Sequence, residues 1–492
     1  MSRQEGVIAP PAPARQVTAV ARARGAQAHW GRLPLRDRLQ ILKRVRAVFA
    51  DNAEKLADLS AASRERPLAE VLAAEVLPLL EAIRFLEKAA GRLLKPQILG
   101  SKLRPMWLAG VRSEVHREAL GVVLIIAPSN YPLLLAGVQV LQALAAGNAV
   151  LLKPAPGCTA ISAAFCNLLV EAGLPMDACI LLLESVDEAE AVIEEGVDKV
   201  ILTGSVGTGR AVLRLAAEKL TAVVAELSGC DAMLVCEDAD LQLTTSALLF
   251  SLRLNDGATC IAPRRVYVAR RVAENLEATL ATAVSRLPQV HASPEMSKRL
   301  RPLIAGALDG GAEFICGGVD EISVTVPVIL SGVGEGSQIL QEDVFAPVLS
   351  LVIYDSAEEA VELVNRCTYA LGASIFSNDL AAAGRLASQL QVGVVTINDL
   401  ITPTADPRLP FGGRRRSGFG VTRGAEGLLE MTALKVITRT RGKSRRHYKP
   451  TGSGEVALFA GYISATHGSS RRNKWRGIQQ LWSAMQSLRK GN

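Results

Sequence analysis

Three short stretches of the chain carry the parts needed for covalent chemistry on a carbonyl group. Cys260 ends a stretch of small residues, Glu226 ends an apolar stretch, and Asn130 follows another apolar stretch. A thiolate can attack a carbonyl carbon, a carboxylate can activate water, and an amide can donate a hydrogen bond to an oxyanion. Each residue on its own also fits an ordinary structural role. Their joint occurrence predicts acyl-type chemistry at Cys260.

The other cysteines and the histidines narrow the kind of chemistry. The chain has eight cysteines, none in a Cys-x-x-Cys pair, and five histidines, so no metal site is expected. No histidine lies near Cys260 in the sequence, and a Cys–His protease therefore has no support. The scattered cysteines predict free thiols in a reducing compartment, and we expect a cytoplasmic protein.

Further motifs occur in a fixed order along most of the chain. They are Pro128-x-Asn130-Tyr131-Pro132, Lys153-Pro154, Thr203-Gly204-Ser205 with Gly209, Glu226-Leu227, Asn255-x-Gly257-x-x-Cys260, Asp343-x-Phe345-Ala346-Pro347, Pro410-Phe411-Gly412-Gly413 and Ser417-Gly418-Phe419-Gly420. From about Gln27 to about Thr438 the sequence thus resembles the aldehyde dehydrogenase superfamily. The resemblance implies an NAD(P)-dependent, non-acylating enzyme that oxidises an aldehyde to a carboxylic acid.

The resemblance also implies a role for each of the three residues. Cys260 would attack the aldehyde carbon as a thiolate to form a thiohemiacetal. Backbone dipoles, a general base or the positive charge of the bound cofactor would activate it by lowering the thiol pKa. Asn130 and the backbone N–H of Cys260 would support the oxyanion, and loss of hydride to a nicotinamide would leave a thioester. Glu226 would then activate the water that hydrolyses this thioester.

Two alternatives stay open. Acylating relatives, which pass the acyl group to coenzyme A, often lack the general base, so Glu226 favours hydrolysis. The chain also departs from the family pattern, with Ser129 in place of a common Trp and with Ser228 and Cys230 in place of Gly and Lys. These departures leave room for a catalytically silent, membrane-recruited scaffold.

The expected cofactor is NAD or NADP. Residues 203–209 follow an apolar strand and open a helix, so their backbone N–H groups could meet a pyrophosphate. The resemblance implies cofactor contacts from Lys153, Gly204, Ser205, Gly209, Leu227, Asp343 and Phe345. Asp343 replaces the usual Glu, one methylene longer. Many NAD-preferring members place a Glu at the position of Pro156, and without that charge NADP is not excluded, although NAD is favoured.

Length and hydrophobic patterning predict an α/β protein of more than one domain. At 492 residues, with 49% hydrophobic residues, the chain is too long for one core. Residues 36–94 have helical spacing, and short apolar strands then alternate with helices, which predicts parallel sheets covered on both faces. The predicted strands are 122–126, 149–152, 180–183, 200–202, 223–227, 233–235, 266–268, 348–352, 373–376 and 394–397. The predicted helices between the first of these strands are 159–173, 187–195 and 208–219.

The family pattern turns this alternation into two Rossmann-like domains and a small β oligomerisation element. The expected parts are an N-terminal helical part of the cofactor domain (1–102), an oligomerisation segment (103–119), an NAD(P)-binding domain (120–228), a catalytic domain (229–420), a second oligomerisation segment (421–440) and a basic tail (441–492). The resemblance implies a homodimer or a homotetramer.

The tail has a character of its own. It holds eleven Lys or Arg and one acidic residue, a net charge of 11 − 1 = +10, which leaves 7 − 10 = −3 for the rest of the chain. Within 471–490 an apolar helical face is predicted, formed by Trp475, Ile478, Leu481, Trp482, Met485 and Leu488. A basic helix with Trp is typical of peripheral contact with an anionic membrane surface, which would suit an apolar long-chain or isoprenoid aldehyde. Docking on the protein itself is the alternative, and no nucleic-acid motif accompanies the charge.

Overall fold

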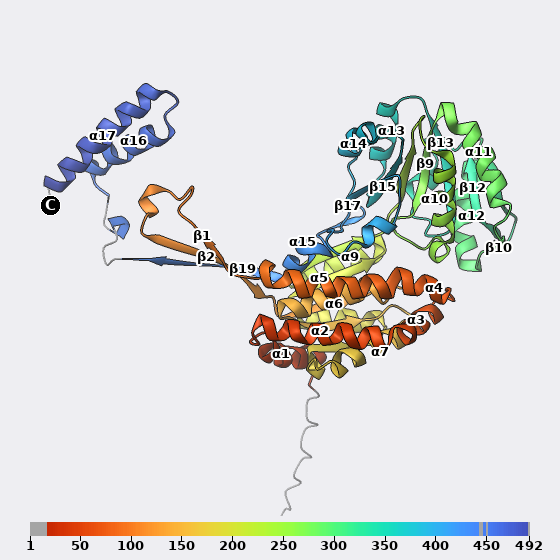
Figure 1. Cartoon of the computed structure of the whole chain (residues 1–492), viewed down its shortest axis with the longest axis horizontal. Coiled ribbons are helices and arrows are strands. Elements are labelled where there is room, and N and C mark those ends of the chain that lie inside the picture. Colours follow the sequence, from red (N-terminus) through yellow and green to blue (C-terminus); the bar gives the residue numbers. More distant parts are fainter. Residues whose placement is uncertain (1–16, 442–445, 449–450, 491–492) are drawn as a thin grey trace, which may run out of the picture. The chain divides into compact units, whose positions relative to one another are not determined.

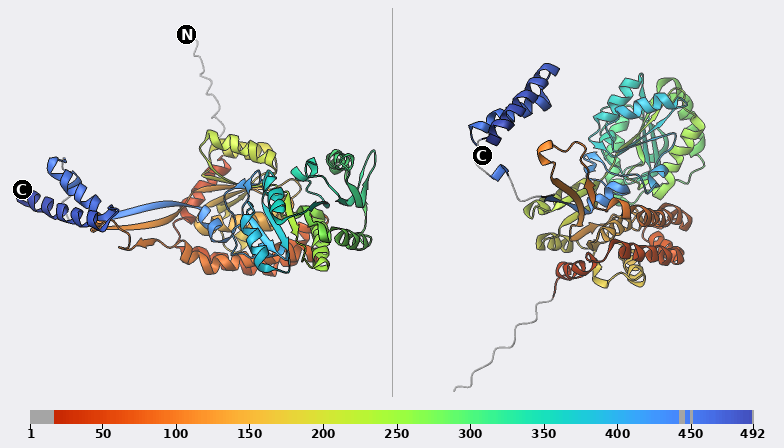
Figure 2. Two further views of the ribbon diagram at one scale, coloured as in Figure 1. Left: turned by 90° about the horizontal axis from the view of Figure 1, so that it is seen from above. Right: turned by 60° about the vertical axis from the view of Figure 1, so that its left-hand side comes forward.

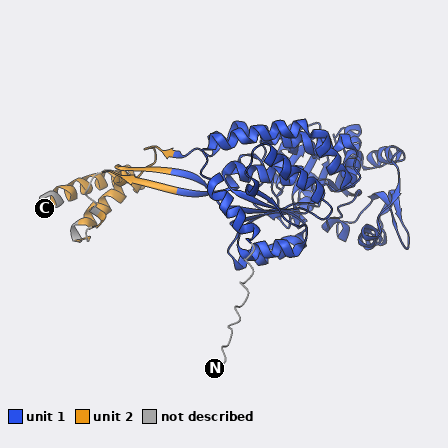
Figure 3. Cartoon of the chain, turned by 90° about the horizontal axis from the view of Figure 1, so that it is seen from below, with its two compact units in different colours: residues 1–97, 115–435 blue, residues 98–114, 436–492 orange. Residues whose placement is uncertain are grey.

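A computed structural model describes residues 17–441, 446–448 and 451–490 of the chain (Figure 1). The chain divides into two compact units (Figure 3). Unit 1 consists of residues 1–97 and 115–435, and unit 2 consists of residues 98–114 and 436–492. Both predicted α/β domains and all predicted site residues belong to unit 1. Residues 1–16 of the predicted segment 1–102 lie outside the described residues.

Helices make up the N-terminal part of unit 1. They are α1 (Ala19–Trp30), α2 (Leu35–Asp51), α3 (Ala53–Ala62), α4 (Leu68–Val71), the π-helical turn η1 (Leu72–Val76) and α5 (Leu77–Leu93). Leu42, Val45 and Phe49 recur at helical spacing on α2 and are fully buried. The predicted helical region 36–94 is therefore confirmed.

The first sheet is mostly parallel and carries the predicted cofactor residues. Its strands are β3 (Val122–Ile126), β4 (Ala149–Lys153), β5 (Cys179–Leu181), β6 (Lys199–Gly204), β7 (Ala222–Leu227) and β18 (Gly418–Phe419). The order is β18-β7-β6-β3-β4-β5, and only β18 runs antiparallel, with Gly418 opposite Glu226. The connecting helices are α6 (Leu134–Ala146), α7 (Thr159–Glu171), η3 (Met176–Ala178), α8 (Val186–Glu195) and α9 (Val206–Glu218). The predicted strands and helices of this region match within three residues.

The second sheet is mixed, and the loop with the predicted nucleophile Cys260 precedes its strand β9. Its strands are β8 (Asp231–Val235), β9 (Pro263–Ala269), β10 (Val290–His291), β11 (Glu313–Val319), β12 (Val324–Ser331), β13 (Val348–Tyr354), β15 (Gly372–Phe376) and β16 (Val394–Ile397). The order is β10-β12-β13-β9-β8-β15-β16, with β11 paired to β12. Strands β10 and β11 are antiparallel to β12, which the sequence patterns did not predict.

Helices and short turns complete this part of unit 1. They are α10 (Leu241–Arg253), η4 (Leu254–Gly257), α11 (Arg270–Val284), α12 (Pro294–Asp309), η5 (Gln338–Gln341), α13 (Ala357–Arg366), α14 (Leu380–Gln389), η6 (Thr402–Ala405) and α15 (Gly424–Glu430). Figure 2 shows the two sheets with helices on their faces. The predicted α/β architecture is confirmed.

Two small sheets include the segments predicted for oligomerisation. Strands β1 (Gln97–Leu99), β2 (Val111–Ala119) and β19 (Thr432–Thr440) form one, with a 3-10 turn η2 (Met106–Leu108) between the first two. Strands β14 (Tyr369–Ala370) and β17 (Arg414–Arg415) form the other. The predicted segment 421–440 is only partly a strand, because α15 occupies most of its first half. Gln142 of α6 donates a hydrogen bond from Nε2 to the Gly424 carbonyl at the start of α15 (3.2 Å).

The tail folds into a pair of helices after the short turn η7 (Arg446–Tyr448). They are α16 (Ser453–His467) and α17 (Arg471–Lys490), which lie side by side in each view (Figures 1 and 2). Glycines form the contact: a Cβ on Gly461 would lie 2.6 Å from the Leu481 nitrogen, and one on Gly477 would lie 2.3 Å from the Ala465 nitrogen. Helix α16 was not predicted from the sequence.

The predicted apolar face of α17 is therefore wrong in one respect. Leu481 lies on the side that packs against α16, whereas Trp475, Ile478, Trp482 and Met485 are exposed. The side chains of Leu488, Arg489 and Lys490 lie outside the described residues. Among the described residues, no helix is both long enough and apolar enough to cross a bilayer.

Candidate active site

The loop before Cys260 has an unusual backbone that a set of side chains holds in place. Asn255, Asp256 and Gly257 have φ values of 51°, 49° and 70°, three successive residues in the left-handed region. A Cβ at position 257 would lie 2.6 Å from the Pro347 nitrogen, so only glycine fits there. Asn255 donates from Nδ2 to the Asn130 carbonyl (2.9 Å). Cys260 is partly exposed at the end of this loop.

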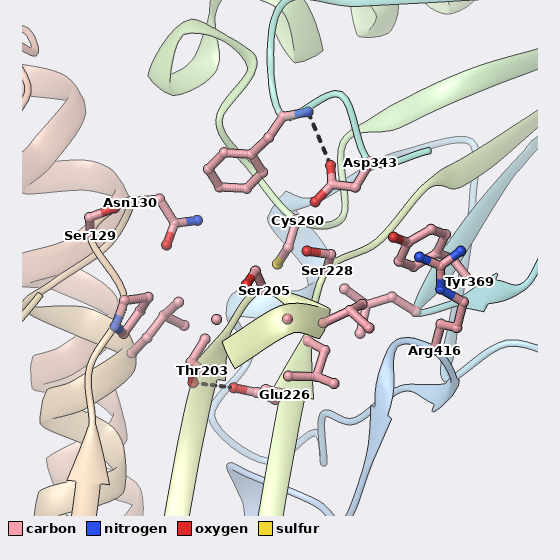
Figure 4. Close-up of a pocket in the computed structure, with 18 of the residues that line it drawn as sticks. Ser129, Asn130, Thr203, Ser205, Glu226, Ser228, Cys260, Asp343, Tyr369 and Arg416 are labelled. Atoms are coloured by element: carbon pink, nitrogen blue, oxygen red, sulfur yellow. Dashed lines mark hydrogen bonds between the residues drawn. The ribbon is translucent and has the colours of Figure 1, made fainter. Parts of the chain in front are cut away.

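Asn130 faces the same cavity as Cys260 (Figure 4). Its side-chain amide is 4% exposed, and Nδ2 donates to the Ala258 carbonyl (3.1 Å). Among the described residues, that carbonyl is the only acceptor that the Asn130 amide meets, so its second N–H stays available. A fixed donor beside a thiol is the arrangement that an oxyanion site requires.

Glu226 is the penultimate residue of β7, and its side chain has polar neighbours. Its carboxylate accepts hydrogen bonds from Thr422 Oγ1 (2.6 Å), Thr203 Oγ1 (3.1 Å) and Gln139 Nε2 (3.4 Å). Figure 4 shows the side chain directed toward Thr203. Burial raises the pKa of Glu226, while Arg423, Thr422 and Thr203 oppose the rise. A buried carboxylate with a raised pKa is suited to general-base chemistry near neutral pH.

The partners of Glu226 were not identified from the sequence. Thr422 and Arg423 follow the glycine motif that ends at Gly420, and Gln139 lies in the middle of α6. The sequence does mark Gln139 as unusual, because it is one of two glutamines in a helix of otherwise apolar residues. Nothing in the sequence around Thr422 indicates its role, since it donates its hydrogen bond to Glu226 from 196 residues away in the chain.

The protein groups around Cys260 favour the protonated thiol over the thiolate. Burial raises its pKa to about 12, and the negative charges of Glu226 and Asp231 act in the same direction, against Arg423. The surrounding side chains therefore do not supply the lowered thiol pKa that was expected for activation. Ionisation needs a positive charge that these groups do not supply, or transfer of the proton to a base.

This pKa predicts how Cys260 reacts with iodoacetamide. Alkylation requires the thiolate, and the thiol is protonated below its pKa, so the rate should rise with pH. We expect about a tenfold increase per pH unit between pH 7 and 10, without a plateau. Mass spectrometry of the peptide that contains Cys260 measures the rate. A plateau below pH 8 would show that the thiol ionises readily.

A cavity of about 440 Å³ brings together most of the predicted site residues. Those that line it are Asn130, Gly204, Ser205, Glu226, Leu227, Cys260, Asp343 and Phe345. Lys153 and Gly209 do not line it. Gly209 is buried in α9, where a Cβ would lie 2.8 Å from Leu227 Cδ1, so this glycine lets the helix pack on β7. Lys153 ends β4 and is 7% exposed.

The cavity has features that fit a dinucleotide. The N-terminus of α9 opens onto it, and Val206 and Gly207 of the first helical turn line it. That turn holds no acidic residue, so its backbone N–H groups favour an anion such as a phosphate. Asp343 lies opposite, accepts a hydrogen bond from the Phe345 N–H (3.0 Å), and has a pKa raised by burial.

A second cavity, of about 810 Å³, meets the first at Cys260. The two cavities share Leu135, Cys260 and Phe411. The larger one is lined by apolar side chains, including Phe250, Leu254, Ile261 and Ile401, and by charged residues, including Arg66, Glu70, Arg253 and Arg423. The thiol thus lies where two cavities meet, and the smaller of them is suited to a dinucleotide.

Comparison with known proteins gives the family. The sequence model of the aldehyde dehydrogenase family matches residues 9–437. A 4,4'-diapolycopene aldehyde oxidase of Methylomonas sp is 30% identical over 479 residues, which cover 95% of this chain and 90% of that protein.

Solved structures agree with the sequence match. A putative aldehyde dehydrogenase of Burkholderia cenocepacia has a TM-score of 0.78 at 33% identity, covering 86% of this chain and 91% of that one. An NAD-dependent aldehyde dehydrogenase of Sinorhizobium meliloti has a TM-score of 0.80 at 28% identity, covering 88% of each chain. The chain belongs to the aldehyde dehydrogenase family of enzymes.

Proposed function

We propose that this protein oxidises an aldehyde to a carboxylic acid with NAD or NADP as the hydride acceptor. The observation that carries the proposal is the lining of one cavity by Cys260, Asn130 and Glu226, with a helix N-terminus suited to phosphate beside them. The S. meliloti relative is described as NAD-dependent, and Pro156 leaves NADP open for this chain.

The residues divide the reaction between them. The Cys260 thiol gives its proton to water as Sγ bonds to the aldehyde carbon, while the second N–H of Asn130 and the backbone N–H of Cys260 hold the oxyanion. A nicotinamide dinucleotide held beside Gly204, Ser205 and the start of α9 would supply the hydride acceptor, and loss of hydride from the adduct would leave a thioester on Cys260. Glu226 takes a proton from water, and the resulting hydroxide attacks the thioester carbon. The C–S bond then breaks, and the proton on Glu226 returns to the leaving sulfur, which releases the acid and restores the thiol and the carboxylate.

The acylating alternative differs only in the last step. Coenzyme A in place of water would give an acyl-CoA product. Glu226 favours water, because its buried carboxylate lies in the cavity where the thioester would form. Product analysis with and without added coenzyme A separates the two reactions.

We propose an apolar long-chain or isoprenoid aldehyde as the substrate. The cavity of about 810 Å³ is large, and its walls beside Cys260 include Phe250, Leu254 and Ile261. The Methylomonas relative is named for an aldehyde of diapolycopene, and it matches this chain over almost its whole length. Both observations support an extended apolar substrate.

A panel of aldehydes tests the activity and the substrate class together. Acetaldehyde, succinate semialdehyde, decanal and an isoprenoid aldehyde would each be assayed with NAD and with NADP. We expect kcat/KM to rise about tenfold or more from the two-carbon to the ten-carbon aldehyde, since each buried CH₂ contributes roughly 0.8 kcal/mol. Equal values along the series would contradict an apolar site, and no oxidation of any member would contradict the activity.

We also propose that the tail holds the protein on an anionic membrane surface. Trp475 and Trp482 are 63% and 66% exposed on α17, and the helix presents exposed cations at its start. These cations are Arg471, Arg472, Lys474 and Arg476. Exposed Trp beside clustered cations is typical of helices that lie in the headgroup region of a bilayer. The match with the Methylomonas protein covers 95% of the 492 residues, or about 467. The family region ends at residue 437, so a match of this length must continue into the tail.

Binding to lipid vesicles tests this contact. Replacing Trp475 and Trp482 by Ala should lower binding to phosphatidylglycerol vesicles about tenfold or more, as should deletion of residues 441–492. Leu183→Ala is the matched control, because Leu183 is 69% exposed and belongs to unit 1, whereas the tail belongs to unit 2. Unchanged sedimentation with the vesicles would refute the membrane role and leave docking on another protein surface.

We further propose a homodimer or homotetramer, located in the cytoplasm or on the membrane surface. Strand β19 lies at the edge of its sheet and exposes Leu434 and Val436, so it offers a strand edge to a second copy.

The alternative that the protein is a catalytically silent scaffold is tested by the reactivity of Cys260. An active site predicts that aldehyde and dinucleotide protect this thiol from iodoacetamide, whereas a scaffold predicts no protection.

A further inference from the structure

A buried carboxylate from the N-terminal helices reaches the segment that carries Asn130. Glu75 lies in the π-helical turn η1, and its side chain is fully buried. Its Oε2 atom accepts hydrogen bonds from the backbone N–H groups of Leu133 (2.9 Å) and Leu134 (3.2 Å). These residues begin α6, directly after the Asn130 loop. A carboxylate at this point also complements the positive end of the helix dipole.

The other oxygen of Glu75 leads to the cysteine loop. Oε1 accepts hydrogen bonds from Ser60 Oγ (2.7 Å) and from the guanidinium of Arg66, which is buried with it. The Arg66 guanidinium carbon lies 5.4 Å from the ring centroid of Tyr131, and Tyr131 shares a hydrogen bond with Thr259 Oγ1 (2.6 Å). One ion pair therefore contacts the neighbour of Asn130 and, through it, the neighbour of Cys260.

We infer that Glu75, held by Arg66, is a positioning residue for the oxyanion donor Asn130. A buried ion pair is costly to desolvate and is weak as a source of stability, but it can fix one geometry among several. Its placement in a π-helical turn fits this role, because such turns often occur at functional sites. The inference rests on the proposed function, in which Asn130 stabilises an oxyanion on the substrate.

The test replaces Glu75 by Gln. In the wild type both carboxylate oxygens accept hydrogen bonds, but an amide has one oxygen that accepts and one NH₂ group that donates. The NH₂ group would therefore point at a second donor, either the N–H groups at the start of α6 or the Arg66 guanidinium. We expect kcat/KM for decanal to fall about 10- to 100-fold through displacement of Asn130. Alkylation of Cys260 by iodoacetamide should change less than about threefold, because attack on a saturated carbon forms no oxyanion. Glu87→Gln is the matched control, since Glu87 pairs with Arg46 between α2 and α5, away from the start of α6.

A double-mutant cycle shows whether Glu75 acts through Asn130. In an Asn130→Ala background, Glu75→Gln should lower kcat/KM by less than about threefold further. A full additional loss in that background would overturn the inference, as would a parallel loss of the alkylation rate. If the Gln variant does not fold, Glu75→Asp serves in its place, because the shorter carboxylate keeps the charge and withdraws it from α6.

A measurement without turnover separates this inference from the proposed function. Decanal that adds to Cys260 protects the thiol from iodoacetamide, and this addition requires the oxyanion site but not oxidation. Protection without oxidation in the wild type would refute the proposed function, and weaker protection in Glu75→Gln would still support the positioning role. Equal protection in both proteins, or none in the wild type, would overturn it.

Discussion

Cys260→Ala should abolish aldehyde oxidation, with kcat falling by about 10⁴-fold or more. The variant lacks the atom that bonds to the substrate carbon, and among the described residues Cys260 is the only cysteine that lines either cavity. Both the first turnover and the steady rate should be lost. Reduced dinucleotide, followed by its absorbance in a stopped-flow instrument, measures both phases.

Cys236→Ala is the matched control for this loss. Cys236 is the other partly exposed cysteine, and it lines neither cavity. Its replacement should leave both phases within about twofold of the wild type. Oxidation by the Cys260 variant at more than a hundredth of the wild-type rate would mean that hydride leaves the substrate without a covalent bond to this sulfur.

Glu226→Gln should separate the two halves of the reaction. The amide can still accept a hydrogen bond from Thr422 but cannot take a proton from water, so the thioester should form and persist. We expect a burst of about one reduced dinucleotide per active site, followed by steady turnover lowered by about 10²- to 10⁴-fold. Mass spectrometry of the quenched protein should find the acyl group on Cys260.

The pH dependence provides a second measure of the same residue. The pKa of Glu226 is raised by burial, so the fraction of active carboxylate increases with pH above the ordinary range of a Glu. If thioester hydrolysis limits the rate, steady turnover of the wild type should therefore rise with pH from about pH 5 upward. The Gln variant should lack this rise. Normal steady turnover in that variant would remove Glu226 from the role of base.

The strands that the sequence predicted best are those buried on both faces. Strand β3 is an uninterrupted apolar run of five buried residues, and its predicted bounds, 122–126, are the observed ones. The hairpin of β11 and β12 was missed for a physical reason. Its first strand includes Gly317 and Gly318, carries two register shifts and is mostly half-buried, so it shows neither an apolar run nor a clean alternation.

The residues proposed to react could be identified from the sequence, whereas the residues that hold them could not. Cys260 and Glu226 follow recognisable local motifs, because each needs a particular turn or strand end around it. Glu75 and Thr422 reach the site from distant parts of the chain, and the pattern around each is that of an ordinary helix or loop. Only the fold brings them within hydrogen-bond distance.

The tail shows a similar limit. Helical spacing predicted α17, but it placed Leu481 with the exposed tryptophans, because the partner helix α16 was unknown. The small residues Gly461 and Gly477 set which side of α17 is covered. Spacing alone therefore predicts that a helix is amphipathic without predicting which apolar residues remain exposed.

The position of Cys260 between two cavities has a consequence for the order in which the product and the coenzyme are released. An acid released on the side of the larger cavity need not pass the space that fits the dinucleotide. We therefore expect exchange of the spent coenzyme and escape of the product to be independent events.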